Sequence, residues 1–502
     1  MQDQYFLILD CGATSLRAIA INEEGKILSV ASFANSPRSQ KENPEFLIWD
    51  IEEMWDVFCK AIRKVVGEVG KGVRAVAVTT FGADGAPVKK DGTLTYPVIS
   101  WQCSRTASWV TRIEQLIDSW EAFAITGYQV LPFNTLLKFL WLRENAPQTL
   151  EEADTFLMMP GLLSFRLCGE MFLDFTSAST AMLLDLQERK WSSRLLDLVG
   201  LDPEFFPPLV YPGEVVGRIH NKASQETQIP AGTPVVVCGH DTQFALVGSL
   251  AGDEDLILSS GTWEIAAFRS RKFLTSRKAF ELGMLIELDA EDGYWNPQML
   301  MIAGGVVEWM RRNLFSDVKD DPRIYQIMIQ DALSVPVGSN GVVVIPSFMP
   351  SGPNKPQGTE GTVLGLGLTS SRAQLFRATL EGLSFQLRQA KEAIEEVYHF
   401  SPRGLRVVGG GAKNELWNRI RADVLNLPVT TTSCEEATVL GASLFCKMGV
   451  GDVKNLSEAR ETVKVETKHF DPSPTASLYE ELYREYQKVP YFLAPFYKKR
   501  KK

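Results

Sequence analysis

Two stretches of the chain, one beginning at residue 5 and one near residue 235, follow the same order of predicted elements. In the first, apolar segments at 5–12, 17–22 and 26–33 indicate strands, and residues 50–65 have the apolar spacing of a helix, opened by Asp50 with Glu53 as a capping box. In the second, apolar segments at 234–238, 256–262 and 264–270 precede helical stretches at about 303–314, 371–397, 414–426 and 437–448. Strands alternating with amphipathic helices predict an α/β fold with a central sheet, built twice.

The composition excludes several classes of protein. With 45% hydrophobic and 23% charged residues, the 502 residues do not form a disordered chain and have room for two or three domains. The net charge is −9 although residues 498–502 are all Lys or Arg, so the acidic body does not suit a nucleic-acid partner, and we expect the basic run to be a solvated tail. No apolar run approaches the ~20 residues that span a bilayer. We therefore expect a cytoplasmic protein with no membrane partner.

Glycine and threonine occupy a turn between two apolar strands in both halves: Gly12 and Thr14 in DCGATS, and Gly261 and Thr262 in SSGTW. Such turns present N–H groups and a hydroxyl to phosphate oxygens, whereas the common phosphate-loop, dinucleotide and serine-hydrolase motifs are absent from the sequence. Asp10 ends the strand before the first turn, where a carboxylate could hold Mg²⁺ or its water shell. An aspartate that caps an Asx turn is the alternative.

Asp241, in the sequence CGHDT, is the sharpest catalytic candidate. A carboxylate after the apolar strand 234–238 could accept the proton of a substrate hydroxyl as that oxygen attacks a phosphate. The alternative is an aspartate that caps the following helix, and His240 taken alone is expected to be an ordinary packed histidine. Farther along, the three glycines at 409–411 leave room for adenine or ribose beside the next helix, or form a flexible turn.

Two longer motifs accompany these turns. FNTLLKFLWLREN at 133–145, and GTVLGL at 361–366 followed by QLFRATLE at 374–381, fit two signatures of the FGGY family of carbohydrate kinases. The chain resembles that family over about residues 5–450. The resemblance implies two actin-like (ribonuclease H-like) α/β domains with a nucleotide and sugar cleft between them. Their expected bounds are 1–245 for sugar and the first phosphate turn, 246–455 for ATP and adenosine, and 456–502 for a C-terminal extension with the basic tail.

The resemblance also implies roles for single residues. Asp241 would be the general base, and the sugar would be lined by Gly82, Asp84, His240, Asp241 and Thr242, although turn chemistry in FGADGA explains Asp84 equally well. The ATP phosphates would face Ala13, Thr14, Ser15, Leu16, Arg17 and Thr262, adenosine would face Gly410, and the metal would lie at Asp10. Asn296 fits a further nucleotide contact, but the partner position eight residues on is Gly304 instead of the glutamine found in relatives such as rhamnulokinase.

The implied reaction transfers a phosphoryl group from MgATP to O1 of a ketose, a small-molecule substrate. The nearer alternatives are family members that act on other ketoses, such as L-rhamnulose, D-ribulose or D-xylulose. A more distant alternative is an actin-like binding protein switched by ATP. The sequence is compatible with a homo-oligomer and does not define the oligomeric state.

Overall fold

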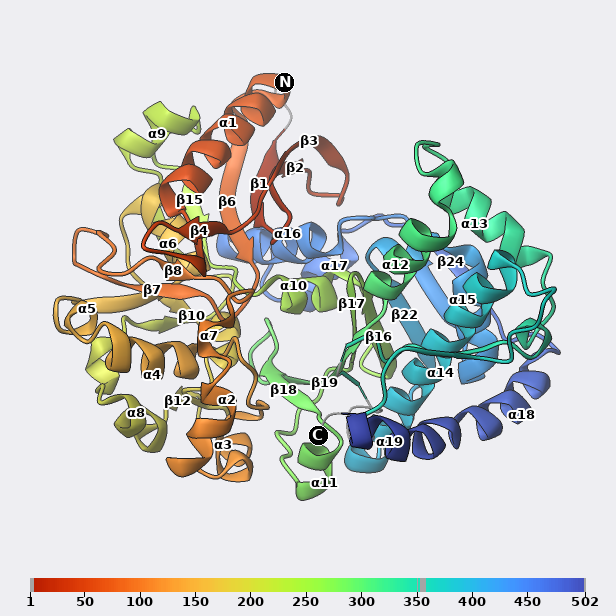
Figure 1. Ribbon diagram of the computed structural model, residues 1–502. Coiled ribbons are helices and arrows are strands. Elements are labelled where there is room, and N and C mark those ends of the chain that lie inside the picture. Colours follow the sequence, from red (N-terminus) through yellow and green to blue (C-terminus); the bar gives the residue numbers. More distant parts are fainter. Residues whose placement is uncertain (1–3, 350, 353–357, 501–502) are drawn as a thin grey trace.

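The computed structural model describes residues 4–349, 351–352 and 358–500 and consists of two α/β halves, each built on a mixed sheet (Figure 1). In the first sheet, β1 pairs antiparallel with β2 and parallel with β6, β2 pairs antiparallel with β3, and β6 pairs parallel with β15. The strand order is β14 (Val215–Arg218), β15 (Pro234–Val236), β6 (Val73–Thr80), β1 (Tyr5–Cys11), β2 (Ser15–Ile21), β3 (Ile27–Ala34).

The second sheet repeats this plan. Here β16 pairs antiparallel with β17 and parallel with β22, β17 pairs antiparallel with β19, and β22 pairs parallel with β23. The strand order is β18 (Leu285–Leu288), β19 (Trp295–Ile302), β17 (Trp263–Ala267), β16 (Asp255–Ser260), β22 (Gly404–Val408), β23 (Val429–Thr432), β24 (Thr467–Phe470). The predicted duplication is therefore confirmed: the run β3-β2-β1-β6-β15 of the first sheet corresponds, strand for strand, to β19-β17-β16-β22-β23 of the second.

Helices cover both faces of the first sheet because its central strand β1 is apolar on both sides. On β1, Leu7 and Leu9 face a core shared with α1 (Ile51–Val69) and α6 (Met159–Cys168), while Phe6 and Ile8 face the opposite core. The second sheet packs against α12 (Gly304–Leu314), α14 (Arg372–Tyr398) and α15 (Glu415–Leu425).

The start of α1 corrects one prediction. The Asp50 side chain caps the helix by accepting the Glu53 N–H at 3.0 Å. The Glu53 carboxylate, however, binds Arg38 instead of returning to Asp50, so the capping box is only half formed. The cause is an exposed guanidinium on a neighbouring strand, a partner that a local motif cannot reveal.

Two helices join the halves. α10 (Asp241–Gly248) follows β15, and α16 (Ala437–Gly449) lies beside it in the middle of the molecule (Figure 1). A Cβ atom on Gly248 would lie 1.9 Å from the Ala437 carbonyl oxygen, and one on Gly441 would lie 2.0 Å from the Phe244 carbonyl oxygen. Glycine at both positions thus lets the two backbones touch, and α16 covers the Phe6–Ile8 face of the first sheet.

The segment expected as a C-terminal extension is built into the second half. Its strand β24 pairs with β23, and Tyr479, Tyr483 and Tyr486 of α18 (Ala476–Tyr486) lie in the core of the second sheet. The chain continues into α19 (Val489–Arg500), where Lys498 and Lys499 are exposed. Residues 501–502 of the predicted basic tail lie outside the described residues.

The remaining elements are smaller. In the first half they are β4 (Arg38–Gln40), β5 (Asn43–Trp49), β7 (Gly85–Val88), β8 (Val98–Ile99), α2 (Trp109–Arg112), α3 (Ser119–Thr126), α4 (Thr135–Asn145), α5 (Gln148–Glu151), β9 (Thr155–Met158), β10 (Leu173–Asp174), α7 (Phe175–Thr180), β11 (Leu184–Asp185), β12 (Lys190–Trp191), α8 (Ser193–Val199), β13 (Leu209–Val210), α9 (Asn221–Thr227). In the second half they are α11 (Arg277–Glu281), α13 (Ile324–Leu333), β20 (Val343–Ile345), β21 (Thr362–Leu364), α17 (Leu456–Glu461). None of the helices in the described part of the chain has the length and apolar character needed to cross a membrane.

Candidate active site

The first glycine–threonine turn joins β1 to β2 at the carboxyl end of β1. The Gly12 N–H donates to the Ser15 carbonyl at 2.9 Å and closes the turn. Asn35, which follows β3, donates from its side-chain amide to the Gly12 carbonyl at 2.8 Å and from its backbone to the Thr14 carbonyl at 2.9 Å. Thr14 is exposed and Ser15 half-buried, so the turn presents its hydroxyls and backbone outward, as phosphate binding requires.

The other residues predicted to face phosphate differ in what they can reach. Ala13 is half-buried at the turn, whereas the Leu16 side chain is 1% exposed and belongs to the core, which leaves only its backbone for a ligand. Arg17 makes ion pairs with Asp10 at 2.7 Å and, from the other half, with Glu436 at 2.8 Å. Burial opposes its charge, but the two carboxylates raise the pKa of Arg17 above its ordinary value, so it stays cationic.

Asp10 fits a divalent cation only as one ligand among several. Its carboxylate accepts the Thr79 hydroxyl at 3.0 Å and the Arg17 guanidinium, and its side chain is 8% exposed. Across the described ranges, no three His, Cys, Asp or Glu side chains are grouped so that they could hold a metal ion. A cation bound here would take its other ligands from water and phosphate oxygens, which is the usual arrangement for Mg²⁺ in phosphoryl sites.

The second glycine–threonine turn joins β16 to β17 and rests on the start of α12. Gly261 and Thr262 are exposed, and their carbonyls accept the N–H groups of Ala303, Gly304 and Gly305 at 3.1–3.3 Å. A Cβ atom on Gly304 would lie 2.2 Å from the Gly261 carbonyl oxygen. Glycine at 304 therefore brings the helix backbone directly onto the turn.

The glycine loop at 409–411 packs against the same turn. Gly410 is exposed with open space around its Cα, whereas a Cβ atom on Gly411 would lie 2.0 Å from the Ser260 hydroxyl. Ser260 donates to Glu264 at 2.7 Å, and Arg421, fully buried on α15, bonds to both. The predicted adenosine loop and the second phosphate turn are thus fixed by one buried network.

Asp241 is the first residue of α10 and not its N-cap, so the helix-capping alternative does not describe it. The loop that carries it lies at the carboxyl ends of parallel strands, because the Thr80 N–H at the end of β6 donates to the Gly239 carbonyl at 2.9 Å. Its side chain is 31% exposed, and Thr242 donates its hydroxyl to it at 3.3 Å. Asp241 therefore stands free enough to meet a substrate.

His240 and Gly82 lie against each other beside Asp241. The His240 Nε2 atom is 3.5 Å from the Asp241 carboxylate, and it would be 3.2 Å from a Cβ atom on Gly82. The same Cβ atom would lie 2.9 Å from Thr180, whose hydroxyl accepts the Ala83 N–H. The structure thus brings together three residues predicted to line the sugar, and glycine at 82 permits the close approach.

The charges around this site shift two pKa values. Burial raises the pKa of Asp241 to about 6; His240 opposes this shift and Asp10 adds to it. Burial lowers the pKa of His240, but Glu287, by its charge and hydrogen bond, and then Asp241 and Asp174 together raise it to about 9. At neutral pH the site therefore holds an ionised carboxylate beside an imidazolium.

Asp84 is built into the interior. Its side chain is 0% exposed and forms an ion pair with Lys138, while its other oxygen accepts Trp49 Nε1 at 2.7 Å and Trp101 N–H at 2.9 Å. Lys138 belongs to the first family signature, so that signature holds the FGADGA loop in place. A sugar contact from Asp84 remains a prediction, and these bonds give the residue a structural role independently of it.

Asn296 lies behind the segment that carries His240 and Asp241 and is fully buried. Its amide nitrogen donates to Gln243 of α10, and its carbonyl oxygen has no hydrogen-bond partner among the described residues. The nucleotide contact expected for Asn296 also remains a prediction. Sequence reasoning missed its neighbour Glu287; the available signal was a charged residue inside an apolar strand, since buried glutamates require partners.

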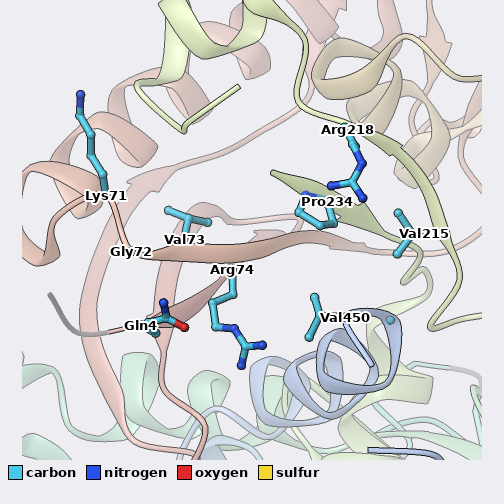
Figure 2. Close-up of a pocket in the computed structure, with 10 residues that line it drawn as sticks. Gln4, Lys71, Gly72, Val73, Arg74, Val215, Arg218, Pro234 and Val450 are labelled. Atoms are coloured by element: carbon cyan, nitrogen blue, oxygen red, sulfur yellow. The ribbon is translucent and has the colours of Figure 1, made fainter. Parts of the chain in front are cut away.

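A cavity of about 450 Å³ lies elsewhere, between the first sheet and the C-terminal end of α16 (Figure 2). Gln4, Gly72 and Val73 line it at the amino ends of β1 and β6, whereas Asp10 and Thr79 stand at the carboxyl ends of the same strands. Arg74, which also lines it, is engaged by Glu23 and Asp452 at 2.6 Å. This cavity is separate from the candidate active site.

The fold and the site together define a carbohydrate kinase. Residues 5–248 match the N-terminal domain, and residues 256–450 the C-terminal domain, of the FGGY family of carbohydrate kinases. The chain therefore belongs to the FGGY family, and the predicted family and two-domain α/β fold are confirmed.

Individual relatives share nearly the whole chain. The L-fuculokinase of Escherichia coli strain K12 is 39% identical over 483 residues, which are 96% of this chain and 100% of the relative. The rhamnulokinase of Bacteroides thetaiotaomicron is 27% identical and covers 94% of this chain and 97% of its own. Among solved structures, ligand-bound xylulose kinase from Lactobacillus acidophilus has the same fold, with a TM-score of 0.88 at 21% identity and 99% of both chains covered.

Proposed function

We propose that this kinase transfers the γ-phosphoryl group of MgATP to O1 of L-fuculose, giving L-fuculose 1-phosphate in the breakdown of L-fucose. The observation that supports L-fuculose as the substrate is the similarity to relatives named L-fuculokinase, which are 34–39% identical over 93–96% of this chain. The rhamnulokinase is more distant at 27% identity. The sequences LDCGATSLRAIAIN and VVGGGAKNELWN also resemble L-fuculokinases.

In this proposal Asp241 is the general base. Its carboxylate orients the O1 hydroxyl and accepts its proton as the oxygen attacks the γ-phosphorus in line. Gly82, His240 and Thr242 surround the sugar, and Asp84 remains a candidate for a further sugar contact. The partial exposure of the Asp241 side chain and its raised pKa support this role, because a base with a pKa near 6 is ionised at neutral pH.

The two turns would bind the nucleotide. Residues 13–17 and Thr262 face the phosphates, Gly410 faces adenosine, and Asn296 is a candidate for a further contact. Mg²⁺, held through Asp10 and water, supplies charge neutralisation on the phosphate oxygens when bound. The turns supply N–H groups and hydroxyls, which explains how a chain of net charge −9 can bind ATP.

The proposal also covers the domain boundaries, the location and the partners of the protein. Residues 1–245 and 246–455 are assigned as the two kinase domains, and 456–502 as a C-terminal extension whose strand β24 and helix α18 pack onto the second domain. A cytoplasmic location is part of the proposal, because ATP is supplied there. We assign no nucleic-acid partner, on the acidic charge of the body of the chain, and leave a homo-oligomer open.

A panel of ketoses tests the substrate. Initial rates with MgATP and L-fuculose, L-rhamnulose, D-ribulose or D-xylulose should give the highest kcat/KM for L-fuculose. A strong preference for another ketose would overturn the sugar assignment and leave a kinase of the same family. ATP hydrolysis that is fast and indifferent to every sugar would favour the ATP-switched binding protein instead.

Asp241→Asn tests the base. Because general-base catalysis is worth ~10²–10⁴ in rate, kcat should fall by about that factor. ATP affinity, measured by fluorescence titration, should stay unchanged, since the amide keeps the shape of the side chain. Thr438→Ala, on α16 near the backbone of Asp241, is a matched control and should keep most of the activity. An unchanged kcat in the Asn variant would remove Asp241 from this role.

The pH profile tests the same carboxylate. Its folded-state pKa is about 6, and only the ionised form accepts a proton, so kcat/KM should fall as the pH drops through about 6. Asp241→Asn should lose this acid limb. An acid limb centred near 4 in the wild type would contradict the raised pKa described for Asp241.

A further inference from the structure

Glu287 reaches the catalytic loop from the other half of the molecule. It lies on β18, an edge strand of the second sheet, and its side chain is 2% exposed. One of its carboxylate oxygens is 3.0 Å from His240 Nδ1. The other ring nitrogen, Nε2, therefore points away from Glu287, towards Asp241 at 3.5 Å and the backbone of Gly82.

The Glu287 carboxylate is itself fixed in place. The side-chain amide nitrogen of Gln243 donates to the same oxygen at 2.5 Å. The carbonyl oxygen of that amide accepts a hydrogen bond from Asn296, the cross-strand neighbour of Glu287. Tyr128 also directs its hydroxyl to Glu287. A carboxylate held from several sides cannot turn away from the imidazole, so the ring orientation is fixed as well.

The charged groups that raise the pKa of His240 are acidic: Glu287 from β18, Asp241 beside it on α10 and Asp174 from β10. Asp174 is buried under the loop and accepts the Thr176 hydroxyl, which in turn accepts the His240 N–H. Of the three, Glu287 makes the shortest contact with the ring, 3.0 Å from Nδ1, compared with 3.5 Å between Nε2 and Asp241. Removing its charge should therefore lower the pKa of His240 more than removing that of Asp174.

We propose that Glu287 is a positioning residue of the kinase: it binds His240 Nδ1 and so holds the imidazole as a cation whose Nε2–H points to Asp241 and to the acceptor hydroxyl. The charge of His240 then favours the ionised form of Asp241, which burial and Asp10 oppose. The sugar end of the site, although carried by the first half, is thus completed by one side chain of the second. The catalytic purpose of this contact rests on the function proposed above.

Three variants test the proposal. Glu287→Gln keeps the shape but not the charge, and Glu287→Asp keeps the charge on a shorter side chain. Asp289→Asn is the matched control: Asp289 follows the same strand and is equally buried, but it pairs with Arg269 at 2.8 Å and does not face His240. Each variant is compared with the wild type by its melting temperature and by the pH dependence of kcat/KM.

A second measurement does not depend on activity. The chain has four histidines, so carbon-13 NMR of labelled imidazole rings can follow each titration, and His240→Asn assigns the signal. In the wild type His240 should titrate near pH 9. In Glu287→Gln it should titrate near or below the ordinary value of about 6.5, whereas in Asp289→Asn it should not move.

The kinetic expectation follows from the titration. The basic limb of kcat/KM should move from near pH 9 towards neutrality in Glu287→Gln, and kcat at pH 8 should fall by up to about 100-fold because the ring is misplaced and uncharged. Glu287→Asp should restore part of both. The KM for ATP should change little in either variant.

Two outcomes would overturn the proposal. One is a His240 signal that still titrates near pH 9 in both Glu287 variants. The other is a loss of melting temperature in Glu287→Gln that matches Asp289→Asn with no displacement of the basic limb. Failure of the proposed function is recognised separately: a fully active Asp241→Asn enzyme would reject Asp241 as the base, whereas the shift of the His240 titration between the wild type and Glu287→Gln is measured without reference to activity.

Discussion

The two glycine–threonine turns occupy matching places in the two sheets but are supported differently. The first depends on a side chain, since the Asn35 amide bonds to the Gly12 carbonyl. The carbonyls of the second are held by backbone donors, the N–H groups of residues 303–305 at the start of α12. A side chain can be exchanged without moving the main chain, whereas the backbone contact requires glycine at 304. The second turn should therefore tolerate less change.

The ion pairs behind the two turns also differ, because the pair behind the second turn is the more deeply buried. Arg17, behind the first turn, is 23% exposed and shared between Asp10 and Glu436. Arg421 and Glu264, behind the second, are 0% and 2% exposed. Removing one partner of a buried pair leaves an uncompensated charge, which is far more costly than the loss of a solvated pair.

The largest expected effect is therefore on stability, from Glu264→Gln. Loss of the buried pair should lower the free energy of unfolding by about 3–5 kcal/mol, measured by urea denaturation. Glu436→Gln, which removes a partly exposed partner of Arg17, should cost less than about 1 kcal/mol. Equal losses in the two variants would contradict the difference between the turns.

The next largest expected effect, on the KM for ATP, distinguishes the glycines of the two turns. Gly304→Ala places a Cβ atom against the Gly261 carbonyl, and strain of about 1–3 kcal/mol on the turn should raise the KM for ATP about 5- to 150-fold. Gly305→Ala meets mainly the flexible end of Ile302 and is the matched control. Gly12→Ala, 3.1 Å from the Ser15 carbonyl, should have a much smaller effect on the same KM. Equal effects at 12 and 304 would show that the two turns are equally constrained.

The smallest effect concerns Asn35→Ala. Loss of one hydrogen bond, worth about 0.5–1.5 kcal/mol, should raise the KM for ATP about 2- to 10-fold with little change in kcat. Asn22→Ala removes comparable side-chain hydrogen bonds from the turn between β2 and β3 and should leave this KM unchanged. A KM unaffected by Asn35→Ala would show that the first turn holds its shape without the side chain.

Elements defined by local patterns were predictable from the sequence. The helices expected at about 303–314, 371–397, 414–426 and 437–448 are α12, α14, α15 and α16, each within a residue or two of its bounds. The repeated order of elements along the chain followed from apolar segments alone. Apolar spacing and flanking Gly or Ser residues are short-range signals, so no tertiary contact was needed to recognise them.

The contacts that hold the site residues in place were not predictable in the same way. Asp10, Asp241 and both turns lie in short motifs, but the partners that fix them come from far along the chain. Glu287 is 47 residues from His240, and Arg421 is 157 residues from Glu264. Asp84, expected as a turn residue or a sugar ligand, forms an ion pair with Lys138, 54 residues away. A spacing motif records which residue types occur and carries no information on these contacts.

The position of α16 has a consequence for the order in which the protein is made. One face of the first sheet is complete when residue 236 has left the ribosome, but the other is covered by a helix that begins at residue 437. At ~5–20 residues per second, roughly 200 intervening residues take about 10–40 s to translate. During that time Phe6 and Ile8 are not yet covered by α16. The N-terminal half of the protein is therefore fully protected from aggregation only after the C-terminal half has been synthesised.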